Sequence, residues 1–222
     1  MSQNFEEIAN NEFIQNLEDR IYDFMLNKFF DKTNEGNFRL FAYKNDAAHR
    51  SVEVYYHSET NEFRVQIHVG LNTFCLSEFF TSDFSTFVSS LKAELPKVIR
   101  YYNFFDGTED ELVLNKNFSK WSYGNSLPDN IGEFELFIRP SKALEITNGS
   151  FVIIDYCDFS TNSDLVIYYN VFQDDFSGEL RINGTTTVIS DFDVDNLKDL
   201  EKQLNLNMNN CLNKIRSQIK KI

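Results

Sequence analysis

The chain has 222 residues, a length that suits one large domain or two small ones. Its 34 acidic and 21 basic residues give a formal net charge of −13 at pH 7, which disfavours non-specific attraction to nucleic acid or to an anionic membrane. No apolar run reaches the roughly 18 residues of a membrane span, and the acidic N-terminus does not resemble a signal peptide. We therefore expect a cytoplasmic protein that makes no membrane contact.

Residues 1–36 are expected to form an N-terminal amphipathic helix and a linker. Within residues 4–30, apolar side chains recur at steps of three and four positions, as in a helix that buries one face. These side chains are Phe5, Ile8, Phe13, Leu17, Ile21, Phe24 and Met25. The sequence leaves open whether this helix packs on its own sheet or on a partner.

Residues 37–103 predict four strands followed by a helix. Apolar and polar side chains alternate over residues 51–57 and 62–69, the pattern of antiparallel strands that are buried on one face. Ser82 and Asp83 are candidate N-caps for the helix, which has an apolar face.

Residues 133–222 predict a second copy, after a connector at residues 104–132. Phe-x-Leu-Phe begins at Phe38 and again at Phe134, which is 96 residues later. Ser-Asp-Phe begins at Ser82 and again at Ser190, 108 residues later, and predicts a capped helix start in both copies. Asn-Gly at residues 183–184 is a strong hairpin signal and predicts an extra hairpin in the second copy.

The expected fold class is therefore α+β, with two tandem ββββα repeats related by a pseudo-two-fold axis, plus the N-terminal helix. Each sheet is expected to be covered by one helix, and the two repeats are expected to pack together. This element order resembles that of the Whirly and Pur-type proteins, which bind single-stranded nucleic acid. None of their sequence motifs is present, so the resemblance concerns architecture alone.

The residues do not indicate an enzyme, a cofactor or a metal site. No nucleophile elbow, P-loop or dinucleotide-binding glycine motif occurs. The acidic run at Asp191, Asp193 and Asp195 lacks the glycine and glutamate that a calcium loop requires. Cys75 and Cys157 lie in β-rich runs without a nearby base, as buried structural cysteines do.

The sequence favours a protein that binds another protein, with the acidic charge favouring a basic partner. Such a protein acts as an adaptor or escort, or as an inhibitor whose carboxylates imitate nucleic-acid phosphates. A homodimer is compatible with either role. The candidate contact residues are Tyr55, Tyr168, Tyr169, Trp121, Glu53, Glu59, Glu62, Asp174, Asp175 and Glu179.

The alternative hypothesis is a single-stranded nucleic-acid-binding protein in which aromatic side chains on a sheet stack against bases. The basic residues do not favour it, because they are scattered instead of being interleaved with the aromatics.

Overall fold

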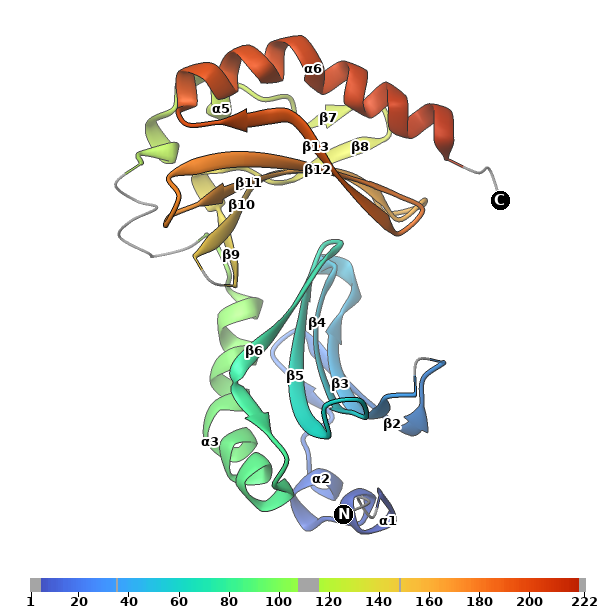
Figure 1. Ribbon diagram of the computed structural model, residues 1–222. Coiled ribbons are helices and arrows are strands. Elements are labelled where there is room, and N and C mark those ends of the chain that lie inside the picture. Colours follow the sequence, from blue (N-terminus) through green and yellow to red (C-terminus); the bar gives the residue numbers. More distant parts are fainter. Residues whose placement is uncertain (1–4, 35, 108–115, 148, 220–222) are drawn as a thin grey trace. The chain divides into compact units, whose positions relative to one another are not determined.

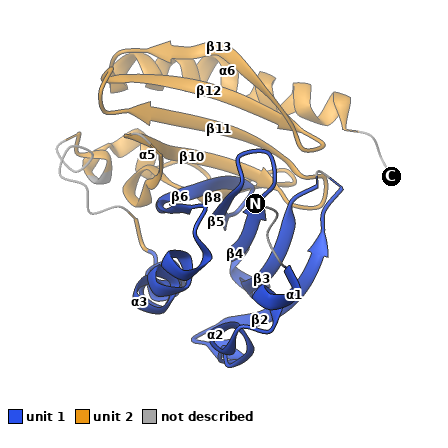
Figure 2. Cartoon of the chain, turned by 60° about the horizontal axis from the view of Figure 1, so that its bottom comes forward, with its two compact units in different colours: residues 1–105 blue, residues 106–222 orange. Residues whose placement is uncertain are grey.

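The computed structural model describes residues 5–34, 36–107, 116–147 and 149–219. The chain forms two compact units, Met1–Phe105 (unit 1) and Asp106–Ile222 (unit 2), which Figure 2 shows in separate colours. Among the described helices, none is both long enough and apolar enough to cross a bilayer.

Unit 1 is an antiparallel sheet of six strands that follow one another in chain order. The strands are β1 (Arg20–Ile21), β2 (Phe24–Lys32), β3 (Phe38–Asn45), β4 (Arg50–His57), β5 (Glu62–Val69) and β6 (Asn72–Thr81). The long helix α3 (Phe84–Asn103) follows and packs against β6 and β1 (Figure 1). Two short helices, α1 (Phe5–Ala9) and α2 (Glu12–Gln15), precede the sheet.

The predicted N-terminal helix over residues 4–30 is wrong, because the part of that segment from Arg20 onward forms the first hairpin of the sheet. The helical pattern is followed only as far as α2, which ends at Gln15 and is capped by Asn16, whose backbone N–H donates to the Glu12 carbonyl. β1 and β2 are then joined by a tight turn in which Tyr22 has a left-handed backbone, with φ of 52°. A turn of that kind is normally signalled by glycine or asparagine, and the tyrosine conceals it.

Unit 2 is an antiparallel sheet in the order β13-β12-β11-β10-β8-β7, with β9 paired to β10. Its strands are β7 (Asn130–Ile131), β8 (Phe134–Ile138), β9 (Leu144–Thr147), β10 (Ser150–Asp158), β11 (Ser163–Asn170), β12 (Asp175–Ile182) and β13 (Thr185–Val194). The helix α6 (Leu197–Gln218) lies on β11, β12 and β13, and the short α5 (Ser122–Asn125) precedes the sheet.

The α+β class with two similar sheet-and-helix units is confirmed, but each sheet has more strands than the four predicted. Most strands of unit 1 have a counterpart at a fixed spacing in unit 2, whose sheet has one strand more. Both bounds of β11 lie 113 positions after those of β4, and the same spacing relates β5 to β12, β6 to β13 and the start of α3 to the start of α6. The first hairpin recurs with a spacing of 110, since β7 and β8 begin that many positions after β1 and β2.

This spacing corrects the predicted alignment of the two copies. Phe38 opens β3, whereas Phe134 opens β8, the counterpart of β2, so the predicted register is one strand out. The Asn183-Gly184 turn joins β12 to β13, which correspond to β5 and β6, and is therefore not an extra hairpin. Ser190 lies inside β13, and α6 is capped by Asn196, whose side chain accepts from the Asp199 N–H.

Individual tertiary contacts are duplicated as well. The Tyr43 hydroxyl donates to the Glu18 carbonyl at 2.8 Å, and Tyr156, 113 positions later, donates to the Pro128 carbonyl at 2.8 Å. Both tyrosines are completely buried, and a buried hydroxyl without a partner costs roughly 1–3 kcal/mol. The paired contact thus fixes the segment that enters the first hairpin in each unit.

The cores lie between each sheet and its helix. In unit 1, Phe63 on β5 stacks against Phe87 on α3, with ring centroids 5.0 Å apart. Side chains alternate along a strand, so the neighbours of Phe63 on β5, Glu62 and Arg64, lie on the opposite face. We call that face, in either unit, the helix-free face.

Candidate binding surfaces

Unit 1 exposes four large apolar side chains on its first hairpin and at the end of α3. Tyr22 is 47% exposed, Met25 50%, Tyr101 46% and Phe104 62%. The rings of Tyr22 and Phe104 meet edge to face, with centroids 5.1 Å apart. We call these four residues the unit 1 patch. Tyrosine and methionine side chains exposed in this way are enriched at protein–protein contacts.

The two elements that carry the patch are joined directly. The backbone N–H of Asp23 in the β1–β2 turn donates to Asn103 Oδ1 at the end of α3, at 3.1 Å. Arg20 closes the turn, donating to the Tyr22 carbonyl at 2.6 Å and to Asp23 Oδ1 at 3.2 Å. The exposed rings therefore lie in a two-residue turn and at the end of a helix, and not on a long loop.

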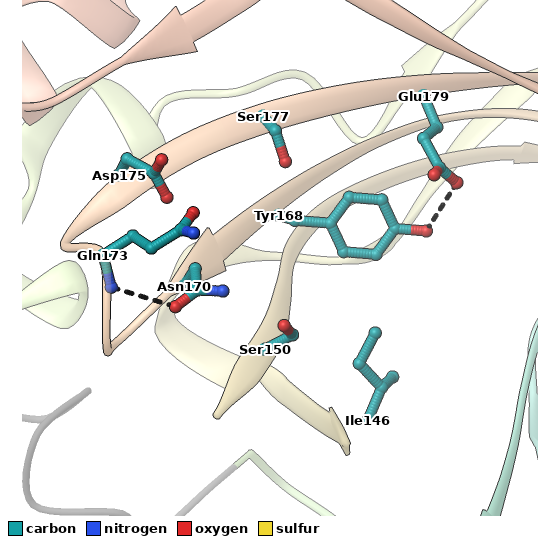
Figure 3. Close-up of a pocket in the computed structure, with 8 residues that line it drawn as sticks. All are labelled: Ile146, Ser150, Tyr168, Asn170, Gln173, Asp175, Ser177 and Glu179. Atoms are coloured by element: carbon teal, nitrogen blue, oxygen red, sulfur yellow. Dashed lines mark hydrogen bonds between the residues drawn. The ribbon is translucent and has the colours of Figure 1, made fainter. Parts of the chain in front are cut away.

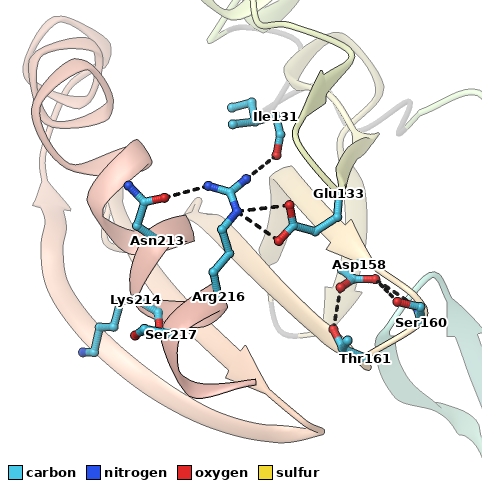
Figure 4. A network of polar contacts seen from close by, with 9 residues as sticks. All are labelled: Ile131, Glu133, Asp158, Ser160, Thr161, Asn213, Lys214, Arg216 and Ser217. Carbon is cyan, nitrogen blue, oxygen red and sulfur yellow. Dashed lines mark hydrogen bonds and ion pairs between the residues drawn. The ribbon is translucent and has the colours of Figure 1, made fainter. Parts of the chain in front are cut away.

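The same place in unit 2 is polar. At the corresponding spacings, Tyr22, Met25, Tyr101 and Phe104 are replaced by Gly132, Glu135, Lys214 and Ser217. The end of α6 is fastened to its hairpin by an arginine, as Figure 4 shows. Arg216 donates to Glu133 at 2.9 Å and to the Ile131 carbonyl at 2.7 Å.

The turn residue in the first hairpin is a further difference between the two units. Tyr22 and Gly132 share the left-handed backbone, with φ of 52° and 67°. Glycine adopts this conformation freely, whereas other residues lose roughly 1–2 kcal/mol. A Cβ at Gly132 would lie 2.5 Å from Arg216 Nη2, while unit 1 has the shorter Asn103 at that helix position. Unit 1 thus keeps a tyrosine at a strained position that the duplicated fold fills with glycine.

The helix-free face of unit 2 holds a cavity of about 330 Å³. Figure 3 shows its lining, in which the Tyr168 hydroxyl donates to Glu179 Oε2 at 3.1 Å. The lining residues are Ile146, Ser150, Tyr168, Asn170, Gln173, Asp175, Ser177 and Glu179.

A second polar feature of unit 2 is a buried acidic cluster. The ligating atoms of Asp155, Cys157 and Asp164 lie within 4.8 Å of one another, and all three residues are buried. This set of two carboxylates and a thiol is of a kind that Zn²⁺ accepts. Arg181 Nε, however, lies 3.5 Å from Asp164 Oδ2, in an ion pair without hydrogen-bond geometry. Arg181 therefore places a positive charge beside the cluster, which favours the ionised form of Asp164.

The pKa of Asp164 reflects this environment. Burial, followed by repulsion from Asp155, raises the pKa of Asp164 from 3.8 to about 8, although the charge of Arg181 acts in the opposite direction. Strand pairing explains the approach, because Asp164 lies opposite Cys157 on one side and opposite Arg181 on the other.

Two of the four predicted aromatic contact residues are core residues of unit 2. Trp121 is 8% exposed and its Nε1 donates to Glu201 Oε2 at 3.4 Å. Tyr169 is 2% exposed and donates to Asp174 Oδ1 at 2.8 Å. Tyr55, on the helix-free face of unit 1, is 7% exposed, with its hydroxyl 3.6 Å from Cys75 Sγ. Tyr168 lines the cavity of unit 2.

The predicted acidic contact residues lie in several settings. Glu59 is exposed in the β4–β5 turn, whereas Glu53 is partly buried, and burial raises its pKa. Glu62 is paired with Arg64 at 3.0 Å, and Asp174 is paired with Lys116. Asp175 and Glu179 line the cavity of unit 2. The paired carboxylates are already neutralised by a neighbouring cation, so they do not form a row of free charges.

The four patch residues are absent from the predicted contact residues, and the predicted helix over residues 4–30 conceals the turn at Tyr22. These residues are identified by comparing equivalent positions of the two units. Equivalent positions are known only once the spacings of 113 and 110 residues are known. No family model, curated protein or solved structure matches the chain.

Proposed function

We propose that this chain is a non-enzymatic protein-binding protein and that the unit 1 patch is its contact surface. The observation that carries the proposal is the contrast between the units. The fold is built twice, and the copy in unit 2 forms without exposed aromatics at this position. The rings of the unit 1 patch are therefore not required by the fold, and an apolar surface that the fold does not require is typical of an interaction site.

The strain at Tyr22 supports the same conclusion. A left-handed tyrosine is less stable than a glycine at the same position, and such strain is found mainly where function retains it. Tyrosine is also among the residues that contribute most to binding at interface centres.

The charge of the chain indicates the chemistry of the partner. At −13, with a sequence pI of about 4.6, the protein attracts basic proteins and repels acidic ones. We propose a partner that places an apolar anchor on the unit 1 patch and carries basic side chains around it. Because Glu62 and Asp174 are each paired with a cation, an adaptor or escort fits better than a mimic of nucleic-acid phosphates.

Single-stranded nucleic-acid binding is the second candidate. On unit 1, Arg39 lies 4.3 Å from the Phe29 ring centroid and Arg64 lies 4.7 Å from that of Phe80, which combines a cation with an aromatic surface. However, Arg39 is paired with Asp31 at 2.8 Å, and Arg64 is paired with a glutamate. These carboxylates compete with a phosphate, so we rank this function second.

The test replaces the unit 1 patch by its unit 2 counterpart, through Tyr22→Gly, Met25→Glu, Tyr101→Lys and Phe104→Ser. The added charges cancel, so the net charge is unchanged. The matched control is Phe172→Ser, since Phe172 is 77% exposed in unit 2. Circular dichroism and thermal unfolding first establish that both variants are folded.

Proteins captured by the wild-type chain are then purified and titrated by calorimetry. We expect the patch variant to bind the partner at least tenfold more weakly and the control to bind as the wild type does. Equal binding by the patch variant would show that the patch is not the contact surface. Salt-sensitive binding of single-stranded oligonucleotides, unchanged in the patch variant, would favour the second candidate.

A further inference from the structure

A single arginine fills the helix-free face of unit 1 near the β4–β5 turn. Arg64 Nη2 donates to Glu62 Oε2 and to Thr60 Oγ1, both at 3.0 Å. Arg64 pairs across the strands with Tyr55, and its guanidinium lies over the Phe80 ring. The space between these side chains is therefore occupied by a tethered cation.

Unit 2 has the same strands in the same register but lacks that arginine. Tyr168 pairs with Ser177 as Tyr55 pairs with Arg64, and Ser177 lies 113 positions after Arg64. The serine side chain is too short to fill the space, and the cavity of about 330 Å³ is found there.

The groups that surround Arg64 in unit 1 have counterparts that line the cavity in unit 2. Gln173 and Asp175 occupy the positions of Thr60 and Glu62, the two hydrogen-bond acceptors of Arg64. Figure 3 shows the Tyr168 ring lying across the cavity, with Asp175 and Gln173 on one side of it and Glu179 on the other.

The lining is suited to a cation. It contains two carboxylates, those of Asp175 and Glu179, together with amide and hydroxyl oxygens, and none of the described lining residues is basic. A guanidinium or ammonium group makes its strongest hydrogen bonds to carboxylates and is also attracted by the face of a tyrosine ring. A cavity of this size admits a side-chain-sized group.

We propose that the cavity on the helix-free face of unit 2 binds a ligand that carries a guanidinium or primary ammonium group, in the position that Arg64 fills in unit 1. The ligand is either an arginine or lysine side chain of a protein or a free alkyl amine, since both present the same group. This site is separate from the unit 1 patch, and its existence does not depend on the patch binding a partner.

The test is a calorimetric or NMR titration of the full chain with two matched probes, Nα-acetyl-arginine amide and Nα-acetyl-citrulline amide. Citrulline has the same shape but no charge. We expect the arginine probe to bind at least tenfold more tightly than the citrulline probe, with NMR shifts confined to residues that line the cavity. Equal binding of the two probes, or shifts elsewhere in the chain, would overturn the proposal.

Variants of the lining make the test specific. Ser177→Arg places a tethered guanidinium in the cavity, as unit 1 does, and should abolish binding of the arginine probe while raising the melting temperature. Leu206→Arg adds the same charge at an exposed position on α6, outside the lining, and should bind as the wild type does. Glu179→Gln should weaken binding at least fivefold without loss of fold. Undiminished binding by a folded Ser177→Arg variant would also overturn the proposal.

Two further probes distinguish the sources of the cation. If the ligand is a protein side chain, an arginine flanked by glycines in a capped tripeptide should bind more tightly than agmatine, because the peptide backbone adds contacts. If the ligand is a free amine, agmatine should bind at least as tightly as the peptide. Failure of both probes to bind would reject the site but would leave the patch experiment unaffected.

Discussion

At the scale of single residues, Tyr22 shows how the two matched units differ at one position of the same turn. Its φ of 52° is matched by a φ of 67° at Gly132, so the turn is the same in both units and only the side chain differs. Retaining tyrosine at a left-handed position costs roughly 1–2 kcal/mol, which indicates that the ring is selected for a reason other than stability.

The first prediction tests this argument. Tyr22→Gly removes the left-handed strain but also removes the ring contact with Phe104 and adds backbone entropy to the unfolded chain. We expect the free energy of unfolding in urea to remain unchanged or to rise by up to about 1 kcal/mol, while partner binding weakens. A loss of more than about 1 kcal/mol would mean that the Tyr22 ring is structural.

Asp164 gives the second prediction, which concerns pH. Its pKa is raised to about 8 in the folded chain, so between about pH 4 and pH 8 the folded state binds more protons than the unfolded state. Its contribution to stability is therefore greatest at low pH and is lost as the pH rises through this window. Asp155, Cys157, Arg181 and Glu179 are the titratable or charged groups around it.

Asp164→Asn should remove this dependence. Between pH 5 and pH 7.5, we expect wild-type stability to fall relative to the variant by up to about 1.4 kcal/mol per pH unit, measured by urea unfolding at each pH. Glu59→Gln is the control, because Glu59 is exposed in a turn, and it should run parallel to the wild type. Parallel curves for wild type and Asp164→Asn would show that the carboxyl group is charged throughout.

At the scale of elements, the two long helices begin with different signals. Asp83 caps α3 by accepting from the Thr86 N–H at 2.7 Å, and Asn196 caps α6. The second Ser-Asp-Phe, which matches the first in its letters, lies inside β13, where Phe192 is completely buried.

The third prediction tests which residues act as N-caps of the two long helices. Asp83→Ala and Asn196→Ala should each lower the free energy of unfolding by about 1 kcal/mol, as the loss of an N-cap does. Asp191→Ala, at the exposed position that the repeated motif would equate with Asp83, should change it by less than about 0.5 kcal/mol. The free energy of unfolding is measured by chemical denaturation. A larger loss for Asp191→Ala than for Asn196→Ala would show that the second Ser-Asp-Phe acts as a helix start signal.

The elements that could be predicted are those with a clear period. Strands β4 and β5 lie within the segment where polar and apolar residues alternate, and α3 begins at Phe84 as its cap indicates. The first hairpin could not be predicted, because a period of three to four also fits its apolar residues and because Tyr22 replaces the usual turn glycine. The sequence alone therefore could not separate a helix from a hairpin there.

The candidate sites could not be predicted for a related reason. Short identical words, such as Phe-x-Leu-Phe, align the copies one strand out of register, and a shift of one strand preserves the alternating pattern because all the strands share it. In the structural register, Arg64 is set against Ser177 and Tyr22 against Gly132. Both the cavity and the patch are recognised by comparing equivalent residues of the two units. They therefore cannot be found in the sequence while the two copies are aligned incorrectly.

At the scale of the whole molecule, the two similar units differ in their surfaces. Unit 1 carries the aromatic patch and fills its helix-free face with Arg64, whereas unit 2 has a polar corner and an open cavity. Each unit therefore carries one of the two proposed binding features. Unit 2 also has a core cluster composed of its own residues.

The fourth prediction follows from this division. Fragments 1–105 and 106–222, expressed separately, should each unfold cooperatively in circular dichroism, because each contains a complete sheet and its helix. With folding established, fragment 1–105 should retain partner binding and fragment 106–222 should retain binding of the arginine probe. The two features lie in different units, so each fragment contains one of them. If a folded fragment does not bind, the corresponding site needs residues from the other unit. Partner binding by fragment 106–222 alone would contradict the assignment of the contact surface to the unit 1 patch.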